Sequence, residues 1–185
     1  MEHKGTVRLE TDRLILRRFV VEDVQAAYRN WTSDDRTTEF LRWPTHRSVD
    51  VTDGILRHWV AEYARPDFYQ WVIEPRDVGE PIGTISSVGM DEKVGAVEIG
   101  YCIGSPWWGR GYVTEAMAAV MAFFFDEVGV NRVEASFDPN NPGSGRVMQK
   151  CGLKYEGTRR QADFNNRGIV DSALYGMLAS EWRSR

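Results

Sequence analysis

The residues of this chain best suited to chemistry form a short glycine-containing segment, residues 107–116. An extended apolar run, residues 97–103, precedes this segment, and a helical pattern follows it as far as Phe125. The first N–H groups of a helix have no partners within the helix and lie at the positive end of its dipole. Gly109 and Gly111 carry no Cβ, so the backbone there can approach a phosphate closely. The segment therefore predicts a phosphate-binding loop between a strand and a helix.

Two well-known phosphate-binding motifs fit this loop poorly. A dinucleotide-binding loop requires the pattern Gly-x-Gly-x-x-Gly, and Thr114 occupies the position of its third glycine. A Walker A loop requires Gly-Lys-Ser/Thr, which is missing here. Taken alone, the segment also fits an ordinary strand-to-helix turn that binds no ligand.

Hydrophobic periodicity predicts the elements that position the loop. After a first strand at residues 14–19, Val24, Ala27, Tyr28 and Trp31 repeat at the spacing of an amphipathic helix. Further strands are predicted at residues 68–74, 81–88, 95–103, 132–137, 153–164 and 170–178, and further helices at residues 48–63, 112–125 and 142–151. The short polar turns between the middle strands favour antiparallel pairing. We therefore expect one mixed α/β domain spanning residues 1–185.

Turn and cap residues mark several boundaries. Asn141 followed by Pro142 is typical of a helix start, and Gly152 is well placed just after the end of that helix. Residues 165–168 predict a hairpin turn. Residues 34–47 are polar with a few apolar positions, which indicates a long connection.

Composition excludes several classes of protein. The 185-residue chain has a net charge of −4, which disfavours direct nucleic-acid binding because that function needs a basic face. No apolar run reaches transmembrane length and the N-terminus lacks a signal-peptide pattern, so we expect a cytoplasmic protein without membrane contact. The cysteines, Cys102 and Cys151, predict no disulfide framework, and the histidines have no metal-ligand spacing, so no metal is expected.

Four segments, in chain order, carry a resemblance to a known family. They are residues 11–17, residues 97–101 with 108–116, residues 141–144 with 150–157, and residues 171–182. Together they resemble the GNAT superfamily of N-acetyltransferases, in its branch of RimJ/RimL-type ribosomal-protein N-terminal acetyltransferases. The resemblance implies a GNAT fold, with a mixed, mostly antiparallel sheet of about seven strands, splayed at the acyl-CoA site and flanked by about four helices. The family's glycine motif usually begins with Gln or Arg, and Pro106 stands at that position here.

The resemblance also implies acetyl-CoA as cosubstrate. Loop amides from Trp108 to Val113 would hold its pyrophosphate, and a backbone N–H near Ile103 would polarise the thioester carbonyl, an oxyanion-hole role. The residues expected to contact acetyl-CoA are Tyr101, Cys102, Ile103, Trp108, Gly109, Arg110, Gly111, Tyr112, Val113, Asn141 and Ser144. Packing roles fit Tyr101 and Tyr112 equally well.

Glu98 is the candidate general base. An amine is mostly ammonium at neutral pH and cannot attack a thioester until it loses a proton, so a base acting directly or through water is useful. Some family members use a glutamate on this strand, and the sequence around Glu98 is similar. The alternative for Glu98 is a solvent-facing strand position or an ion pair with an arginine.

Ser144 is the candidate general acid. In some members of this branch the serine at this position is a candidate to protonate the departing CoA thiolate, whereas many other members place a tyrosine seven residues after the asparagine. Here that position is Met148, which cannot donate a proton, so Ser144 or water remains. A helix-cap role for Asn141 and Ser144 is the structural alternative.

The reaction expected from the resemblance is direct transfer of an acetyl group from acetyl-CoA to a primary amine, first of all a protein N-terminus. The alternatives are a small amine, such as a polyamine, amino acid or aminoglycoside, and a CoA-binding module with little turnover. A covalent route through Cys102 is disfavoured, because no histidine lies near it in sequence. Residues 30–65 are expected to form one wall of the acceptor groove, although packing is the favoured role of the tryptophans at positions 31, 43, 59 and 71. A homodimer is left open.

Overall fold

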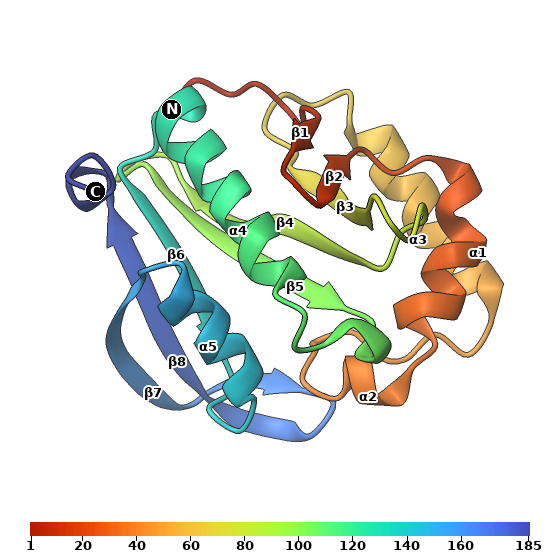
Figure 1. The fold of residues 1–185 in the computed structure, drawn as a ribbon. Helices are drawn as coiled ribbons and strands as arrows, with labels where there is room; N and C mark the ends of the chain where they lie inside the picture. The colour runs from red at the N-terminus through yellow and green to blue at the C-terminus, as the bar shows by residue number, and fades with distance from the viewer.

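An eight-stranded sheet, ordered β1-β2-β3-β4-β5-β6-β8-β7, runs through the computed structural model, which describes residues 1–185 (Figure 1). The strands are β1 (Leu9–Glu10), β2 (Leu14–Arg17), β3 (Gln70–Pro75), β4 (Gly83–Asp91), β5 (Ala96–Ile103), β6 (Arg132–Phe137), β7 (Lys154–Asn165) and β8 (Gly168–Leu178). Every neighbouring pair is antiparallel except β5 and β6, which are parallel. The sheet is therefore mixed and mostly antiparallel, as expected.

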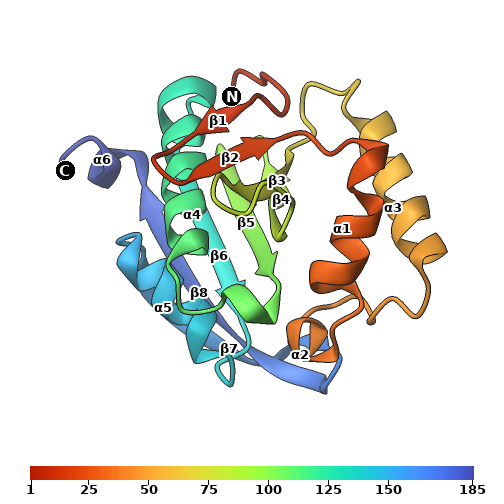
Figure 2. The same ribbon diagram turned by 45° about the vertical axis from the view of Figure 1, so that its right-hand side comes forward.

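The helices cover both faces of this sheet. They are α1 (Val24–Ala27), α2 (Asp35–Thr38), α3 (Val49–Glu62), α4 (Tyr112–Ala122), α5 (Pro142–Lys150) and α6 (Ala179–Trp182). Helices α4 and α5 lie on one face, and α1 and α3 lie on the other (Figures 1 and 2). The larger core, with 29 buried residues, includes much of α4, whereas a core of 7 residues lies under α1 and α3. The larger core therefore anchors the helix that follows the glycine loop.

Most predicted elements are confirmed, with four differences, one of which is the additional one-turn helix α6 at Ala179–Trp182. The sheet has an additional two-residue strand, β1, because Leu9 pairs with Leu16. The predicted connection at residues 34–47 contains the one-turn helix α2, which Asp34 caps by accepting a hydrogen bond from the Arg36 amide. The first predicted strand ends at Arg17, before Phe19, because Phe19 turns into the smaller core and donates its amide to the Tyr63 hydroxyl at 2.9 Å.

Strands β5 and β6 separate along their length. They pair only from Ala96 with Arg132 to Glu98 with Glu134. Beyond that point β5 continues beside β4 as far as Ile103, while β6 continues beside β8. A gap therefore opens between the carboxyl ends of β5 and β6, as the expected splay of the sheet requires.

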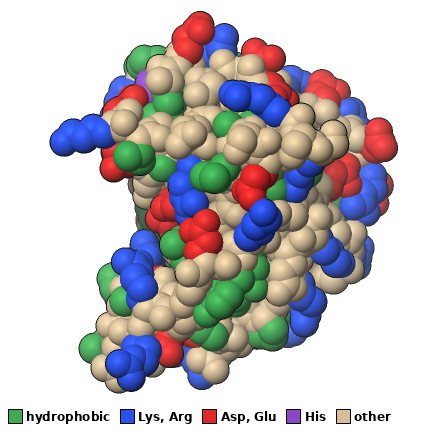
Figure 3. All heavy atoms as spheres, turned by 90° about the vertical axis from the view of Figure 1, so that its left-hand side faces the viewer, with side chains coloured by type: hydrophobic (Ala, Val, Ile, Leu, Met, Phe, Trp, Pro, Cys, Tyr) green, Lys and Arg blue, Asp and Glu red, His purple; other side chains and the backbone are tan.

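On the face shown in Figure 3, basic and acidic side chains are interspersed. None of the helices combines the length and the apolar character needed to span a membrane. No group of three His, Cys, Asp or Glu side chains is arranged to hold a metal ion.

Trp71 offers a test of the larger core. Its side chain is fully buried, stacks on Tyr69, contacts Phe123 edge to face and donates its indole N–H to the Val7 carbonyl at 2.6 Å. Replacing it by alanine leaves a large cavity, so we expect Trp71→Ala to lower the free energy of unfolding by about 3–5 kcal/mol. Denaturant titration measures the change. The control Trp108→Ala removes a side chain that is 47% exposed, and a comparable loss in that variant would contradict the prediction.

Candidate active site

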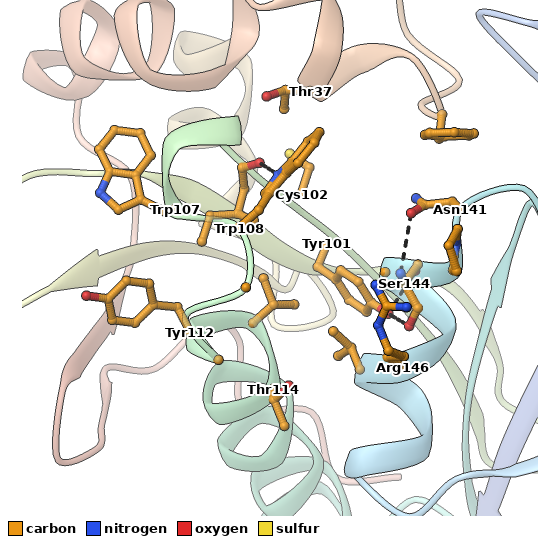
Figure 4. Close-up of a pocket in the computed structure, with 18 of the residues that line it drawn as sticks. Thr37, Tyr101, Cys102, Trp107, Trp108, Tyr112, Thr114, Asn141, Ser144 and Arg146 are labelled. Carbon is orange, nitrogen blue, oxygen red and sulfur yellow. Dashed lines mark hydrogen bonds between the residues drawn. The ribbon is translucent and has the colours of Figure 1, made fainter.

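A cavity of about 450 Å³ lies where the sheet splays (Figure 4). Its walls come from α2 and the turn after it, the end of β5, the loop before α4, the first turn of α4, and α5 along its length. The residues that line the cavity include Arg36, Thr37, Phe40, Leu41, Tyr101, Cys102, Ile103, Trp107, Trp108, Gly109, Gly111, Tyr112, Val113, Thr114, Asn141, Ser144, Arg146 and Lys150. The cavity thus joins three segments that are far apart in the sequence.

The glycine loop forms one end of this cavity. Gly109 and Gly111 have φ angles of 74° and 80°, in the left-handed region that favours glycine. Gly111 is the N-cap of α4, and no side chain caps the first turn of that helix. The first-turn amides of α4 are therefore available to an anionic ligand, as the sequence predicts.

The amide of Ile103 points into the gap between β5 and β6. Gly104 donates its amide to the Ile82 carbonyl at 2.9 Å, and in an antiparallel pair successive residues direct their polar groups to opposite sides of the strand. The N–H and C=O of Ile103 therefore face away from β4. The carbonyl accepts a hydrogen bond from the Trp108 indole at 2.8 Å, which ties the loop to the end of β5.

Tyr101 and Ser144 meet across the cavity floor. The Tyr101 hydroxyl lies 2.9 Å from Ser144 Oγ and 3.0 Å from the Ser144 carbonyl, and Figure 4 shows the ring reaching from β5 toward α5. Burial raises the pKa of Tyr101 well above its usual value, so the phenol stays protonated. Asn141 is the N-cap of α5, and its side-chain oxygen accepts from the Ser144 amide at 3.4 Å. The contact between Tyr101 and Ser144 is absent from the sequence-based predictions.

Glu98 lies further down β5, and it is not one of the residues that line the cavity. Its carboxylate accepts a hydrogen bond from the Ser136 hydroxyl of β6 at 2.5 Å. Strand alternation puts Glu98 on the same face of β5 as Cys102, the face covered by α1 and α3. The pKa of Arg42 is raised chiefly by its hydrogen bonds to Asp163, and the charge of Glu98 adds to the shift.

Comparison with known proteins decides the family. Residues 13–154 match the model of the acetyltransferase (GNAT) domain. The chain belongs to the GNAT acetyltransferase family. It is 31% identical to the uncharacterized N-acetyltransferase YoaA of Bacillus subtilis (strain 168) over 170 residues, which cover 92% of this chain and 96% of YoaA. It is 28% identical to the [ribosomal protein uS5]-alanine N-acetyltransferase of Escherichia coli (strain K12), with 95% of this chain and 93% of that protein covered.

Solved structures of GNAT acetyltransferases share the fold. The structure of RimL, the ribosomal L7/L12 α-N-protein acetyltransferase, in complex with coenzyme A superimposes with a TM-score of 0.82 at 19% identity, covering 93% of this chain and 98% of RimL. The structure of the microcin C7 self-immunity acetyltransferase MccE with acetyl-CoA and AMP gives a TM-score of 0.82 at 18% identity, covering 91% of this chain and 93% of MccE. Family membership makes this chain an acyl-CoA-dependent N-acetyltransferase.

Two residues that were expected to contact acetyl-CoA, Cys102 and Arg110, are not simple lining residues of the cavity in this acetyltransferase. Cys102 lines the cavity and also belongs to the smaller core, and burial raises the pKa of its thiol to about 12. A thiol with so high a pKa is a poor nucleophile at neutral pH, which agrees with the core role expected for it. Arg110 does not line the cavity, and its carbonyl oxygen accepts a hydrogen bond from the Arg13 side chain at 3.0 Å.

One wall of the acetyltransferase cavity comes from α2 and the turn after it. Thr37 fixes this wall by accepting a hydrogen bond from the Ser105 amide at 3.1 Å, and the Arg36 guanidinium lies 5.6 Å from the Trp108 ring. Phe40 and Leu41 are its apolar lining residues. The tryptophans at positions 31, 43, 59 and 71 do not line the cavity.

Sequence reasoning missed two cations on α5. Arg146 and Lys150 line the cavity beyond Asn141 and Ser144. They are four residues apart on one helix, so they share a face. This spacing, next to a segment already expected to contact acetyl-CoA, is the signal that could have identified them.

Proposed function

We propose that this acetyltransferase moves the acetyl group of acetyl-CoA to the α-amine of a protein N-terminus, as ribosomal-protein acetyltransferases do. The observation that carries the proposal is the similarity to the uS5-alanine N-acetyltransferase, which extends over nearly the whole of both chains. The likeness to RimL in fold agrees with it. The cavity supports the donor half of the reaction, because uncapped helix amides and two cations, Arg146 and Lys150, lie along one groove.

In the proposed mechanism the backbone activates the donor. The first-turn amides of α4 hold the pyrophosphate, and the chain leading to the thioester lies in the gap between β5 and β6. The Ile103 N–H, which faces this gap, donates to the thioester oxygen and stabilises the negative charge that develops there during attack. Both partners are held in one cavity, so the transfer needs no covalent enzyme intermediate.

Proton transfer completes the mechanism. Glu98 accepts the proton of the acceptor ammonium through intervening water, because its carboxylate lies outside the cavity wall. Ser144 donates a proton to the departing thiolate and regains one from water. The Tyr101 hydroxyl lies 2.9 Å from Ser144 Oγ, and this hydrogen bond holds the serine in position. Asn141 fixes the first turn of α5, on which Ser144 lies.

Removing the Ser144 hydroxyl tests the proposed acid. We expect Ser144→Ala to lower kcat by about tenfold to a hundredfold and to change the KM for acetyl-CoA little, because the hydroxyl acts on the leaving group. Steady-state assays of thiol release measure both constants. Ser144→Thr keeps a hydroxyl at the position and should retain most of the activity. Equal losses in both variants would assign Ser144 a purely structural role.

The acceptor is tested by offering amines side by side. The purified protein is incubated with acetyl-CoA and with peptides that carry free N-termini, beginning with alanine or serine, and separately with polyamines, amino acids and aminoglycosides. Mass spectrometry locates the added acetyl group. We expect kcat/KM for the best peptide to exceed that for every small amine by at least about tenfold. A small amine that outcompetes all peptides would overturn the N-terminal assignment and leave the acetyltransferase activity intact.

A further inference from the structure

The opening motif, residues 11–13, lies beside the glycine loop although about a hundred residues separate the two in sequence. Figures 1 and 2 both show β1 and β2 next to α4. The proposed mechanism assigns no role to this motif. Its contacts nevertheless converge on the first turn of α4, where the pyrophosphate is proposed to bind.

Arg13 makes contacts with both the loop and the helix. Its Nε lies 2.7 Å and its Nη2 lies 2.6 Å from Glu115 Oε2, and its Nη1 donates to the Arg110 carbonyl at 3.0 Å. The guanidinium also lies 4.9 Å from the centre of the Tyr112 ring. The Arg13 guanidinium therefore already has partners within the protein, on the loop and on the first turn of α4.

Glu115 is held by three donors in addition to the guanidinium contact at Nη2. The Thr11 hydroxyl donates to Oε1 at 2.5 Å, and the Arg13 amide donates to the same oxygen at 3.0 Å. Arg13 Nε donates to the other carboxylate oxygen. Burial opposes ionisation of Glu115, but these hydrogen bonds outweigh it and lower the pKa of the carboxyl. Glu115 is therefore a carboxylate at neutral pH, with Thr11 and Arg13 as its partners.

This carboxylate raises an electrostatic problem. Glu115 lies in the first turn of α4, where a negative charge stabilises the helix. The same charge would repel a pyrophosphate held at that helix end, and at a partly buried site the screening by water is weakened. An unpaired Glu115 would therefore cancel part of the attraction that the helix amides provide.

We propose that Arg13 is a positioning residue for the phosphates of the cosubstrate, an inference that rests on the proposed function. Through its ion pair Arg13 neutralises Glu115, so that the helix end remains attractive to anions. Through the Arg110 carbonyl it fixes the loop in the conformation that directs its amides toward the ligand. Arg13 thus acts through Glu115 and the loop and makes no direct contact with the phosphates.

A double-mutant cycle tests the electrostatic part. Calorimetry measures the Kd of CoA for the wild type, Arg13→Gln, Glu115→Gln and the double variant. We expect Arg13→Gln to weaken binding by about tenfold, the effect of one unpaired charge at a partly exposed site. Glu115→Gln should bind at least as tightly as the wild type. The double variant should recover to within about threefold of the wild type, because the repelling charge is gone.

A donor without phosphates separates this role from a structural one. With S-acetylpantetheine as donor, Arg13→Gln should leave kcat and KM unchanged, whereas with acetyl-CoA it should raise KM and leave kcat nearly unchanged. Arg8→Gln is the matched control, since Arg8 pairs with Glu10 on the same hairpin at 2.7 Å, and it should behave as the wild type with both donors.

Three outcomes would overturn the proposal for Arg13. CoA affinity could be unchanged in Arg13→Gln. The double variant could bind as weakly as Arg13→Gln, which would show that neutralising Glu115 does not account for the effect of Arg13. Activity with S-acetylpantetheine could also be lost, which would make Arg13 a residue that only holds the fold. Absence of CoA binding by the wild type would instead refute the proposed function itself.

Discussion

Gly111→Trp is expected to abolish CoA binding, with a loss in affinity of at least about a hundredfold. Gly111 has a φ of 80°, which strains every L side chain, and an added Cβ would lie 3.4 Å from Arg13 Nη2. A tryptophan there would also occupy space in front of the uncapped first turn of α4. Calorimetric titration with CoA measures the loss.

A matched control separates blockage from backbone strain. Gly129 also has a left-handed φ, 73°, and lies beyond the far end of α4, with no atom within 4 Å of an added Cβ. Gly129→Trp should therefore carry similar strain and bind CoA with unchanged affinity. If the two variants bound CoA equally well, the loop would not be the phosphate site.

Residue types were sufficient to predict those parts of the site whose backbone conformation depends on a few neighbouring residues. The left-handed Gly111, the uncapped start of α4 and the Asn141 cap of α5 follow from residue types that favour one backbone conformation. Gly152, with a φ of 81°, ends α5 as expected. Such features are encoded within a few residues, so the sequence identified the loop and the start of α5 correctly.

Local sequence patterns do not predict contacts between segments that are far apart in the sequence. Asn166, at the tip of the β7–β8 hairpin, donates its side-chain amide to the carbonyls of Thr38 and Trp43, each at 2.8 Å. Arg42 and Asp163 join the same two segments through hydrogen bonds of 2.8 Å. These bonds define how the turn after α2 faces the hairpin, and periodicity within either segment does not indicate them.

The same reasoning explains why the donor was easier to predict than the acceptor. The pyrophosphate is proposed to bind backbone amides, whose position follows from glycine and helix geometry. The wall at Thr37, Phe40 and Leu41 is held by tertiary bonds, such as that from the Ser105 amide to Thr37. We propose that side chains on this wall select the acceptor, and their arrangement is revealed only by the folded chain.

Glu98→Gln is expected to lower kcat/KM by about a hundredfold near neutral pH. Glutamine keeps the size of the side chain and can still accept the hydrogen bond from Ser136, so the fold should be retained. What is lost is a group that takes the proton of the acceptor ammonium. As pH rises through the pKa of the acceptor amine, free amine replaces ammonium and the need for a base declines. The deficit of Glu98→Gln should therefore shrink with rising pH, as pH–rate profiles with one peptide acceptor will measure.

Glu134→Gln provides the control, because Glu134 pairs in register with Glu98 on the neighbouring parallel strand. Its carboxylate is engaged by Arg132 at 2.7 Å, so it has no expected part in proton transfer. We expect Glu134→Gln to follow the wild-type profile across the whole pH range. A deficit in Glu98→Gln that stayed constant with pH would indicate a role in positioning the acceptor. An unchanged rate would remove Glu98 as the base and leave proton removal to water, since the mechanism requires that the amine lose its proton before it attacks.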